Sequence, residues 1–475
     1  MLITLECVIL ALQAVAAVRV SLDSPVGITS QSNSRLSKRS PVQLDGDITK
    51  CYTMKFNLYG VDLGLLVDST MSDTIVPLPS SRNSLGSNIL GITSGKLVTI
   101  KYKGKEYRGF SSTAAVTIPG TAIIDINLPV VAVKKQSPDL VGINPEFDGV
   151  FGFGHPYLLN RHSRITAMDV LYTNNVIPNN EVSIQLCQYG MRSKSFINIG
   201  NTEITAKCGT DGNSVAWVNS PSNDHHTVNI KSILVNGKRV DLPAEFQKKV
   251  EHGHILYSIV ETCSTFMYFP QTVVTALVNA IVDSGAIIVK KTKSERKHKL
   301  SPKEIDDIFW KLHLMLESGF HIDWKNLPTF TIVMYAQTPV TDENSNSVVA
   351  IKLGPRDYLQ KVDSKHLRFT VAVGSNENAA LGIPFMTQLE LTFDLQNARI
   401  GFGPGCGCET ATSEYPTISN SDQVLWSSSQ LPEQPSTSSS DVTSTLRRSL
   451  SRFGSTLRDS ARRGSKHSKA THKKA

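Results

Sequence analysis

Leu66–Pro77 reads LVDSTMSDTIVP: an apolar strand, a turn that carries the carboxylate of Asp68, and an apolar return strand that ends at a proline. A second stretch, Tyr257–Pro270, reads YSIVETCSTFMYFP and repeats this order of features with Glu261 as its acid. Apolar runs of this length, bounded by turn residues, are typical of β-strands. Two strand–acid–turn units so far apart in the chain indicate two lobes that each offer a carboxylate to a shared cleft.

Three further motifs follow in a fixed order. Phe147–Gly154 reads FDGVFGFG, Ala380–Phe385 reads ALGIPF, and Phe393–Phe402 reads FDLQNARIGF. Together with the two acid-bearing turns, over residues 45 to 405, they make the chain resemble the pepsin-like aspartic peptidases (peptidase family A1), whose two lobes each present an Asp-Thr/Ser-Gly turn. The resemblance implies an all-β, bilobal fold with short helices. It also implies a chemistry in which two close carboxylates share a proton, one acting as general base toward water and the other as general acid.

The two turns depart from the family pattern at four positions. Thr70 and Cys263 stand where the family has the glycine that lets backbone pass close to the carboxylates. Met71 stands where a hydroxyl residue supports the first acid, and Glu261 replaces the second Asp. Misplacing a reacting group by about 1 Å can cost on the order of a hundredfold in rate. We therefore favour a peptidase homologue that has lost or nearly lost its activity. The alternative is an active aspartic endopeptidase that cleaves at acidic pH with Asp68 and Glu261 as its acids.

Two helices are expected in the second lobe, and one of them bears on the site. Asp283 begins a literal Asp-Ser-Gly signature and is the less favoured candidate for the second acid. It follows the helical pattern of Val273–Ile281, and Gly285 fits a C-terminal helix glycine, so we interpret it as a helix end. The stretch Ser301–Glu304 predicts a capping box with a first-turn proline, and we expect that helix to stop at Gly319.

The resemblance assigns further residues to the site. Tyr102 lies beside the tip of an alternating hairpin and falls at the family's flap tyrosine, although an ordinary cross-strand aromatic is an equal interpretation. Ser69, Thr262 and Ser264 are the other expected substrate-binding residues, and the hydroxyls of Ser69 and Thr262 are expected to tie the two turns together. Neither a metal site nor a cofactor is expected, because no histidine or cysteine group has convincing ligand spacing.

Composition divides the chain into five segments. An apolar run that leads to small residues indicates a secretory signal, a dibasic pair suggests a processing site, and a Ser/Thr/Pro-rich stretch indicates disorder. We therefore predict a signal peptide, a candidate propeptide, an N-terminal lobe, a C-terminal lobe, and a disordered tail that is first Ser/Thr-rich and then basic. These segments occupy residues 1–16, 17–40, 41–210, 211–408 and 409–475 respectively.

Cysteine usage indicates the compartment. Six cysteines follow the predicted signal, and an even number there indicates an oxidising environment with undetermined connectivity. Cys187 and Cys208 flank one strand and are the candidate pair, whereas Cys263 is either a buried free thiol or a disulfide partner. We expect a secreted, extracellular protein, with an endomembrane or lysosomal compartment as the alternative.

The positive charge belongs to the tail. The whole chain has a formal net charge of +8, while residues 442–475 hold ten Lys or Arg and one acid, a net of +9, which leaves −1 for the rest. A basic tail can contact an anionic surface, although a solvated tail is the simpler interpretation. We expect a monomer that binds a peptide or protein in the cleft and that binds no nucleic acid.

Overall fold

The structure is a computed structural model. The predicted signal peptide, the dibasic site, Cys208 and the basic tail lie outside the residues that it describes, and those expectations stay predictions. The described residues are 18–23, 50–78, 95–102, 105–119, 121, 123–134, 148–156, 165–189, 195–200, 215–222, 225–251, 253–290, 298–405, 415–421 and 423–427.

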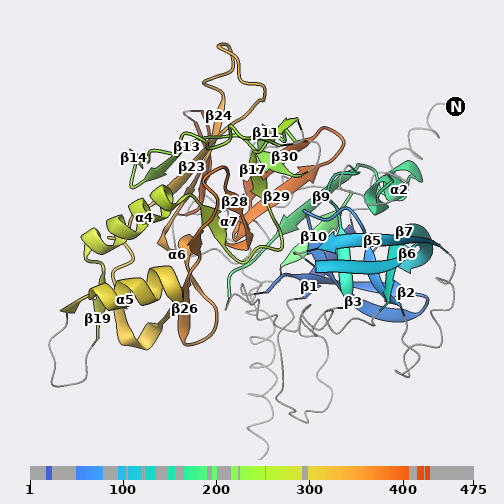
Figure 1. Cartoon of the computed structure of the whole chain (residues 1–475), viewed down its shortest axis with the longest axis horizontal. Helices are drawn as coiled ribbons and strands as arrows, with labels where there is room; N and C mark the ends of the chain where they lie inside the picture. Colours follow the sequence, from blue (N-terminus) through green and yellow to red (C-terminus); the bar gives the residue numbers. More distant parts are fainter. Residues whose placement is uncertain are drawn as a thin grey trace, which may run out of the picture. The chain divides into compact units, whose positions relative to one another are not determined.

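The expected all-β, two-lobed architecture is confirmed, and strands from both halves of the chain share one large sheet (Figure 1). In spatial order its strands are β11 (Ala216–Asn219), β30 (Arg399–Pro404), β29 (Leu389–Asp394), β9 (Glu181–Gln185), β10 (Phe196–Ile199), β1 (Val18–Asp23), β2 (Thr53–Leu58), β3 (Val61–Asp68), β8 (Gly149–Gly152), β4 (Ile75–Leu78), β7 (Ile126–Lys134), β6 (Lys105–Thr117) and β5 (Lys96–Tyr102).

The remaining sheets belong to the second half of the chain. A five-stranded sheet holds β12 (Thr227–Val228), β17 (Ser258–Val260), β28 (Ala380–Leu381), β18 (Met267–Phe269) and β27 (Val371–Val373). A six-stranded sheet holds β14 (Lys238–Arg239), β13 (Ile230–Val235), β23 (Phe330–Tyr335), β24 (Val348–Leu353), β31 (Thr417–Asn420) and β32 (Gln423–Ser427). Smaller sheets hold β15 (Val250–Glu251) with β16 (His254–Ile255), β20 (His298–Lys299) with β19 (Ile287–Val289) and β22 (Phe320–Ile322), and β21 (Leu314–Leu316) with β26 (His366–Phe369) and β25 (Leu359–Lys361).

Helices are short among the described residues. They are α2 (Ala167–Thr173), α4 (Gln271–Ser284), α5 (Pro302–Asp306), the π-helix η4 (Asp307–Lys311), the 3-10 helix η5 (Glu317–Gly319), α6 (Pro355–Tyr358) and α7 (Ile383–Met386). Within the described part of the chain, no helix combines the length and apolar character needed to cross a membrane.

Sequence alternation explains the strands that form the first lobe. In β2 the apolar side chains at alternate positions are buried, while Lys55 between two of them is exposed. This is the pattern of a strand with one face on a core. The predicted hairpin is present: β5 pairs antiparallel with β6, and Tyr102 lies opposite Lys105 at its tip. We call the β5–β6 hairpin the flap.

The two lobes meet in the middle of the large sheet. Strand β9 from the first half of the chain pairs antiparallel with β29 from the second half, so that Ile184 lies opposite Leu391. Strand β1 lies on the first-half side and pairs with both β10 and β2. The backbone of the two lobes is therefore hydrogen-bonded into one sheet beneath the acid-bearing turns.

The helix expected after the second turn is confirmed as α4. It buries apolar side chains at helical spacing, including Val274 and Leu277, and ends at Gly285, whose φ of 62° lies in the left-handed region that glycine tolerates. Asp283 lies exposed in the last turn of this helix, so the Asp-Ser-Gly signature there marks a helix end.

The second predicted helix begins as expected and ends earlier. Ser301 and Glu304 form the predicted capping box at the start of α5. The expected continuation to Gly319 is wrong, because α5 runs into η4 and the chain then enters β21. His313, with a φ of 53°, turns the backbone out of the helix, and β21 pairs with β26. Strand pairing here overrides the helical pattern of the sequence.

Two strands lie within the segment assigned to the C-terminal tail. Strands β31 and β32 extend the six-stranded sheet past β24, and Ile418 lies buried opposite Ile351. The side-chain nitrogen of Lys352 lies 5.3 Å from the ring centre of Tyr415, just before β31. Pairing with a sheet edge therefore orders a stretch whose Ser- and Thr-rich composition had indicated disorder.

Apolar side chains gather in two buried clusters, of which the larger includes residues of both lobes. The smaller one lies against the flap and the first turn, and we call it the flap cluster. Its buried members are Leu66, Met71, Ile75, Ile100, Tyr102, Tyr107, Val131, Val133, Val150 and Cys263, with Cys51 and Val98 packed against them.

Candidate functional site

The two acid-bearing turns are supported by the same arrangement in each lobe. The first turn leaves β3, which pairs parallel with β8, so that Asp68 lies opposite Gly152. The second leaves β17, which pairs parallel with β28, so that Val260 lies opposite Leu381. The glycine-containing motifs quoted from the sequence therefore lie beside the turns, one in each lobe.

Glycines beside the turns permit close backbone approach. A Cβ added at Gly152 would lie 2.3 Å from the carbonyl oxygen of Met71, and one added at Gly382 would lie 2.2 Å from that of Phe266. Side chains do not fit at such distances, so glycine is required at both positions. These two glycines hold each turn against the loop that supports it.

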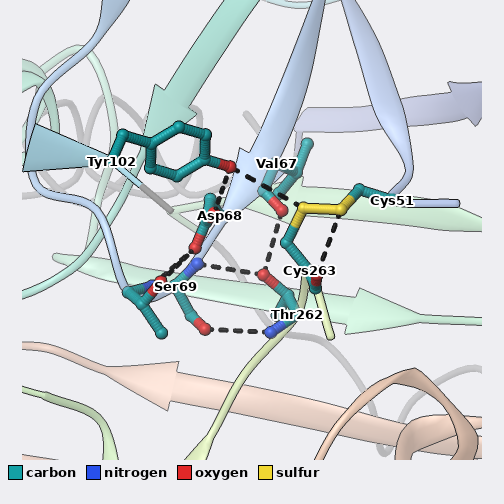
Figure 2. The surroundings of a disulfide bond; sticks show 8 residues. Cys51, Val67, Asp68, Ser69, Tyr102, Thr262 and Cys263 are labelled. Atoms are coloured by element: carbon teal, nitrogen blue, oxygen red, sulfur yellow. Dashed lines mark hydrogen bonds between the residues drawn. A yellow bond between two sulfur atoms is a disulfide. The ribbon is translucent and has the colours of Figure 1, made fainter. Parts of the chain in front are cut away.

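Four hydrogen bonds tie the two turns together, as expected from Ser69 and Thr262. The Ser69 amide donates to Thr262 Oγ1 (2.9 Å), and the Thr262 amide donates to Ser69 Oγ (3.0 Å). Each hydroxyl then donates to a carbonyl before the opposite acid, Ser69 to Val260 (3.0 Å) and Thr262 to Val67 (2.9 Å). Ser69 and Thr262 are buried, and Figure 2 shows how they face one another. We call this set of bonds the interlobe grip.

The carboxylate of Asp68 is completely buried, with 0 % of its surface exposed. Its Oδ1 accepts from the amide (2.8 Å) and hydroxyl (2.7 Å) of Thr70. Its Oδ2 accepts from the hydroxyl of Tyr102 at 2.7 Å. Figure 2 shows Tyr102 directed at Asp68. Both oxygens are thus occupied by donors from the protein itself.

Tyr102 comes from β5 of the flap and is 5 % exposed. Burial, followed by the charge of Asp68, raises its pKa well above the usual value for tyrosine. The hydroxyl therefore keeps its proton and remains a donor to Asp68 at any ordinary pH. The flap tyrosine expected from the resemblance lies at this position and contacts the first acid directly.

Thr70 plays a part that the sequence did not reveal. In the sequence, Thr70 replaces the family's glycine and Met71 replaces the hydroxyl residue that supports the first acid. These replacements indicated that Asp68 had lost its hydrogen-bond support. Instead the Thr70 hydroxyl supplies a hydrogen bond to Asp68, while Met71 packs in the flap cluster. A hydroxyl one position earlier in the turn was the available signal. Support of the first acid is therefore present in a different form.

Two further candidate site residues, Glu261 and Ser264, lie in the second turn. Glu261 is partly buried, and its charge contributes to the raised pKa values of Tyr102 and Tyr268, after burial as the main cause. The Asp68 carboxylate accepts from Thr70 and Tyr102, and its backbone carbonyl accepts from the Phe153 amide. Ser264 is buried and donates to a backbone carbonyl within its own turn.

A disulfide joins Cys51 to Cys263 across a sequence separation of 212 residues, with Cα atoms 4.7 Å apart (Figure 2). It resolves the alternative left open for Cys263. The sulfur of Cys263 lies 3.8 Å from the Tyr102 hydroxyl, so the disulfide borders the first acid. Cys187 is also disulfide-bonded, but Cys208 lies outside the described residues, and that pairing stays a prediction.

A buried histidine pair beneath the turns had been missed. The rings of His155 and His226 lie 4.6 Å apart, and His226 also packs against Phe153 and Phe393. Burial, reinforced by the neighbouring His155 ring, lowers the pKa of His226 to about 3. The backbone oxygen of His226 accepts from Val260, so this pair lies under the second turn. Its two members are far apart in the sequence, which hid their contact.

The geometry limits the chemistry. Peptide hydrolysis by two carboxylates requires a water held between them, so that one can activate it and the other can protonate the leaving group. Here the oxygen of Asp68 that faces the flap accepts a tyrosine hydroxyl, and a disulfide flanks that hydroxyl. Among the described residues, no group of three or more His, Cys, Asp or Glu side chains could hold a metal ion.

Comparison with known proteins identifies one family. Residues 87–405 match the eukaryotic aspartyl protease family. This range includes both glycine-containing motifs, the flap and the second turn, and it extends to the end of β30. No curated protein matches the chain.

Proposed function

Because the chain belongs to the eukaryotic aspartyl protease family, we propose that it is a pepsin-like protein without hydrolytic activity that holds a polypeptide segment at the site between its lobes. The fold and the two turns are those of a peptidase. The residues at the turns depart from the family pattern at four positions, and the proposal rests on that difference.

One observation carries the proposal: the Asp68 carboxylate accepts hydrogen bonds from Thr70 and Tyr102 on its two oxygens. A hydrogen bond that involves a charged group contributes about 1.5 to 3 kcal/mol. The Tyr102 hydroxyl occupies one of the two acceptor positions of Oδ2 and therefore competes with any water that approaches this oxygen. Because burial raises the pKa of Tyr102, its hydroxyl remains a hydrogen-bond donor throughout the acidic and neutral pH range.

The second turn supports the same conclusion. Glu261 is one methylene longer than the aspartate of the family, and a reacting group that is misplaced by about 1 Å can cost on the order of a hundredfold in rate. Cys263 occupies the place where the family has a flexible glycine, and its side chain is fixed by a disulfide. A shared-proton pair needs both carboxylates within direct reach of each other. The longer side chain of Glu261 and the disulfide at Cys263 both alter the second turn where that geometry is set.

Retention of the peptidase scaffold supports a binding role. The interlobe grip and the flap keep both turns and the hairpin beside them in place, so the surface on which a polypeptide would lie is present. An extended polypeptide can lie along a cleft and add main-chain hydrogen bonds to an exposed hairpin edge. Disulfides at Cys51 and Cys187 support an oxidising compartment, and a secreted or endomembrane location suits the family.

The test is cleavage of a denatured, unselective protein substrate from about pH 3 to pH 7, the range over which paired carboxylates change ionisation. Three forms are compared: the wild type, Asp68→Ala, and a repaired form. The repaired form carries Thr70→Gly, Met71→Ser, Glu261→Asp and Cys263→Gly.

We expect no cleavage by the wild type beyond that of Asp68→Ala, and measurable cleavage by the repaired form. Adding Asp68→Ala to the repaired form should abolish its activity, which excludes a contaminating peptidase. Cleavage by the wild type that disappears in Asp68→Ala would overturn the proposal in favour of an active endopeptidase.

A further inference from the structure

The Cys51–Cys263 disulfide connects the two lobes at the site itself. Cys51 lies just before β2 in the first lobe, and Cys263 lies in the second turn. The sulfur of Cys51 also lies 3.1 Å from the carbonyl oxygen of Cys263. The two residues differ in burial, because Cys263 is 4 % exposed while Cys51 is only partly buried.

The same disulfide forms part of the surface on which the flap rests. Cys263 belongs to the flap cluster, and Cys51 packs against it. From the flap, Val98, Ile100 and Tyr102 pack into this cluster. Tyr102 therefore makes two contacts at once: a hydrogen bond to Asp68 at 2.7 Å and a contact with the Cys263 sulfur at 3.8 Å.

We propose that the Cys51–Cys263 disulfide is a reducible latch: it keeps the flap on Asp68, and its reduction by a dithiol releases the flap and opens the site to a polypeptide segment. This inference rests on the proposed function, because it describes how access to the same site is controlled. Release of the flap requires reduction of this disulfide alone.

The chemical step is ordinary thiol–disulfide exchange. A thiolate of the reductant attacks the sulfur of Cys51, which belongs to the less buried of the two residues, and the S–S bond breaks. Cys263 leaves as a thiolate and takes a proton from water, and the reductant is joined to Cys51 in a mixed disulfide. The second thiol of the reductant then displaces Cys51. The protein gains two electrons and two protons, and the dithiol becomes a disulfide.

Reduction acts on the flap because of where the two sulfurs lie. Once the bond is broken, the sulfurs must separate from bonding distance to van der Waals distance. Cys263 is buried, and its sulfur lies 3.8 Å from the Tyr102 hydroxyl. When the two sulfurs move apart, this contact between Cys263 and Tyr102 is therefore disturbed. Close-packed interiors transmit such a change of volume to their neighbours.

The lobes themselves remain joined after reduction. Neither Cys51 nor Cys263 takes part with its side chain in the four bonds of the interlobe grip. The pairing of β9 with β29 is also independent of the disulfide. The expected change is therefore local to the flap, and it is distinguishable from global unfolding.

The test is amide hydrogen exchange of the flap residues 97–102, measured on the full chain in its oxidised form and after treatment with dithiothreitol. We expect exchange to be faster by about tenfold or more after reduction, as for a segment that opens locally, with little change in β9 and β29. The double variant Cys51→Ala, Cys263→Ala should exchange rapidly without reductant. Cys187→Ala is the matched control and should respond to dithiothreitol as the wild type does.

Two results would overturn the latch. One is unchanged flap exchange in reduced wild type, a measurement that needs no variant to fold. The other is loss of the dithiothreitol response in Cys187→Ala, which would place the effect at the other disulfide.

A separate measurement, cleavage of a denatured substrate after reduction, tests the proposed lack of hydrolytic activity. If reduction speeds exchange and also produces cleavage of a denatured substrate that depends on Asp68, the protein is a peptidase controlled by the same latch. Faster exchange without cleavage supports both proposals.

Discussion

Replacing His226 with phenylalanine should change how folding stability depends on pH. His226 is buried among Phe153, His155 and Phe393, and a phenylalanine ring fits the same aromatic contacts. Burial, with His155 as a smaller contribution, lowers the pKa of His226 from 6.5 to about 3. Between these values the unfolded chain binds one more proton than the folded chain. The free energy of unfolding therefore falls as the pH falls through this range.

The size of the effect follows from the pKa shift. One pH unit corresponds to about 1.4 kcal/mol, so His226 lowers the free energy of unfolding by roughly 3 kcal/mol between about pH 6.5 and about pH 4. His226→Phe removes this loss. Its free energy of unfolding, relative to the wild type, should thus become more favourable by roughly 3 kcal/mol over the same interval.

Asp357 provides a matched variant of opposite sign. Burial raises its pKa from 3.8 to about 7, while a bond from the Gly354 amide partly opposes this. Here the folded chain binds the additional proton, so the contribution of Asp357 to stability rises as the pH falls from about 7 toward 3.8. Asp357→Asn should therefore lose roughly 3 kcal/mol relative to the wild type between about pH 6.5 and about pH 4.

Urea unfolding followed by tryptophan fluorescence at these two pH values measures both differences. Opposite signs for the two variants are the expected result, and in the wild type the two contributions nearly cancel. A His226→Phe variant whose stability relative to wild type does not change with pH would refute the reasoning. It would mean that the histidine is hydrated or charged in the folded protein.

Three further substitutions test the contacts at the site. Thr262→Val leaves the buried Ser69 amide without its acceptor and should lower the free energy of unfolding by about 1 to 3 kcal/mol, measured by urea denaturation; an unchanged midpoint would argue against the interlobe grip. Tyr102→Phe removes a donor from buried Asp68 and should cost a similar amount, about 1 to 3 kcal/mol, with faster amide exchange in the flap; wild-type exchange would contradict the contact. Gly382→Ala forces a Cβ against a backbone carbonyl and should cost about 3 kcal/mol or more, so a melting temperature equal to that of the wild type would show that the second turn is looser than described.

Much of the fold was predictable because it depends on local patterns. Alternation of apolar residues predicted strands such as β5. The repeated order of strand, acid and turn at Asp68 and Glu261 predicted two related lobes. The hydroxyl residues Ser69 and Thr262 were expected to join the turns, and they do. Such features follow from side-chain chemistry and spacing within a short stretch of sequence.

The features that could not be predicted depend on distant partners. Cys51 and Cys263 are separated by 212 residues, and nothing in their local sequence indicates a bond. The pairing of β31 with β24 likewise ordered a stretch whose composition indicated disorder, and pairing of β21 with β26 ended a predicted helix. At Thr70 the backbone turn decides where the hydroxyl points. Each of these outcomes is set by tertiary contacts.

The most direct test of the central claim is the initial rate at which the oxidised wild type cleaves a denatured, unselective protein substrate, compared with that of Asp68→Ala. If Tyr102 and Thr70 hold the Asp68 carboxylate out of the chemistry, the two rates should be equal at every pH from about 3 to about 7. A wild-type rate that exceeds the rate of Asp68→Ala at any of these pH values would contradict the account, because Asp68 would then be acting on water.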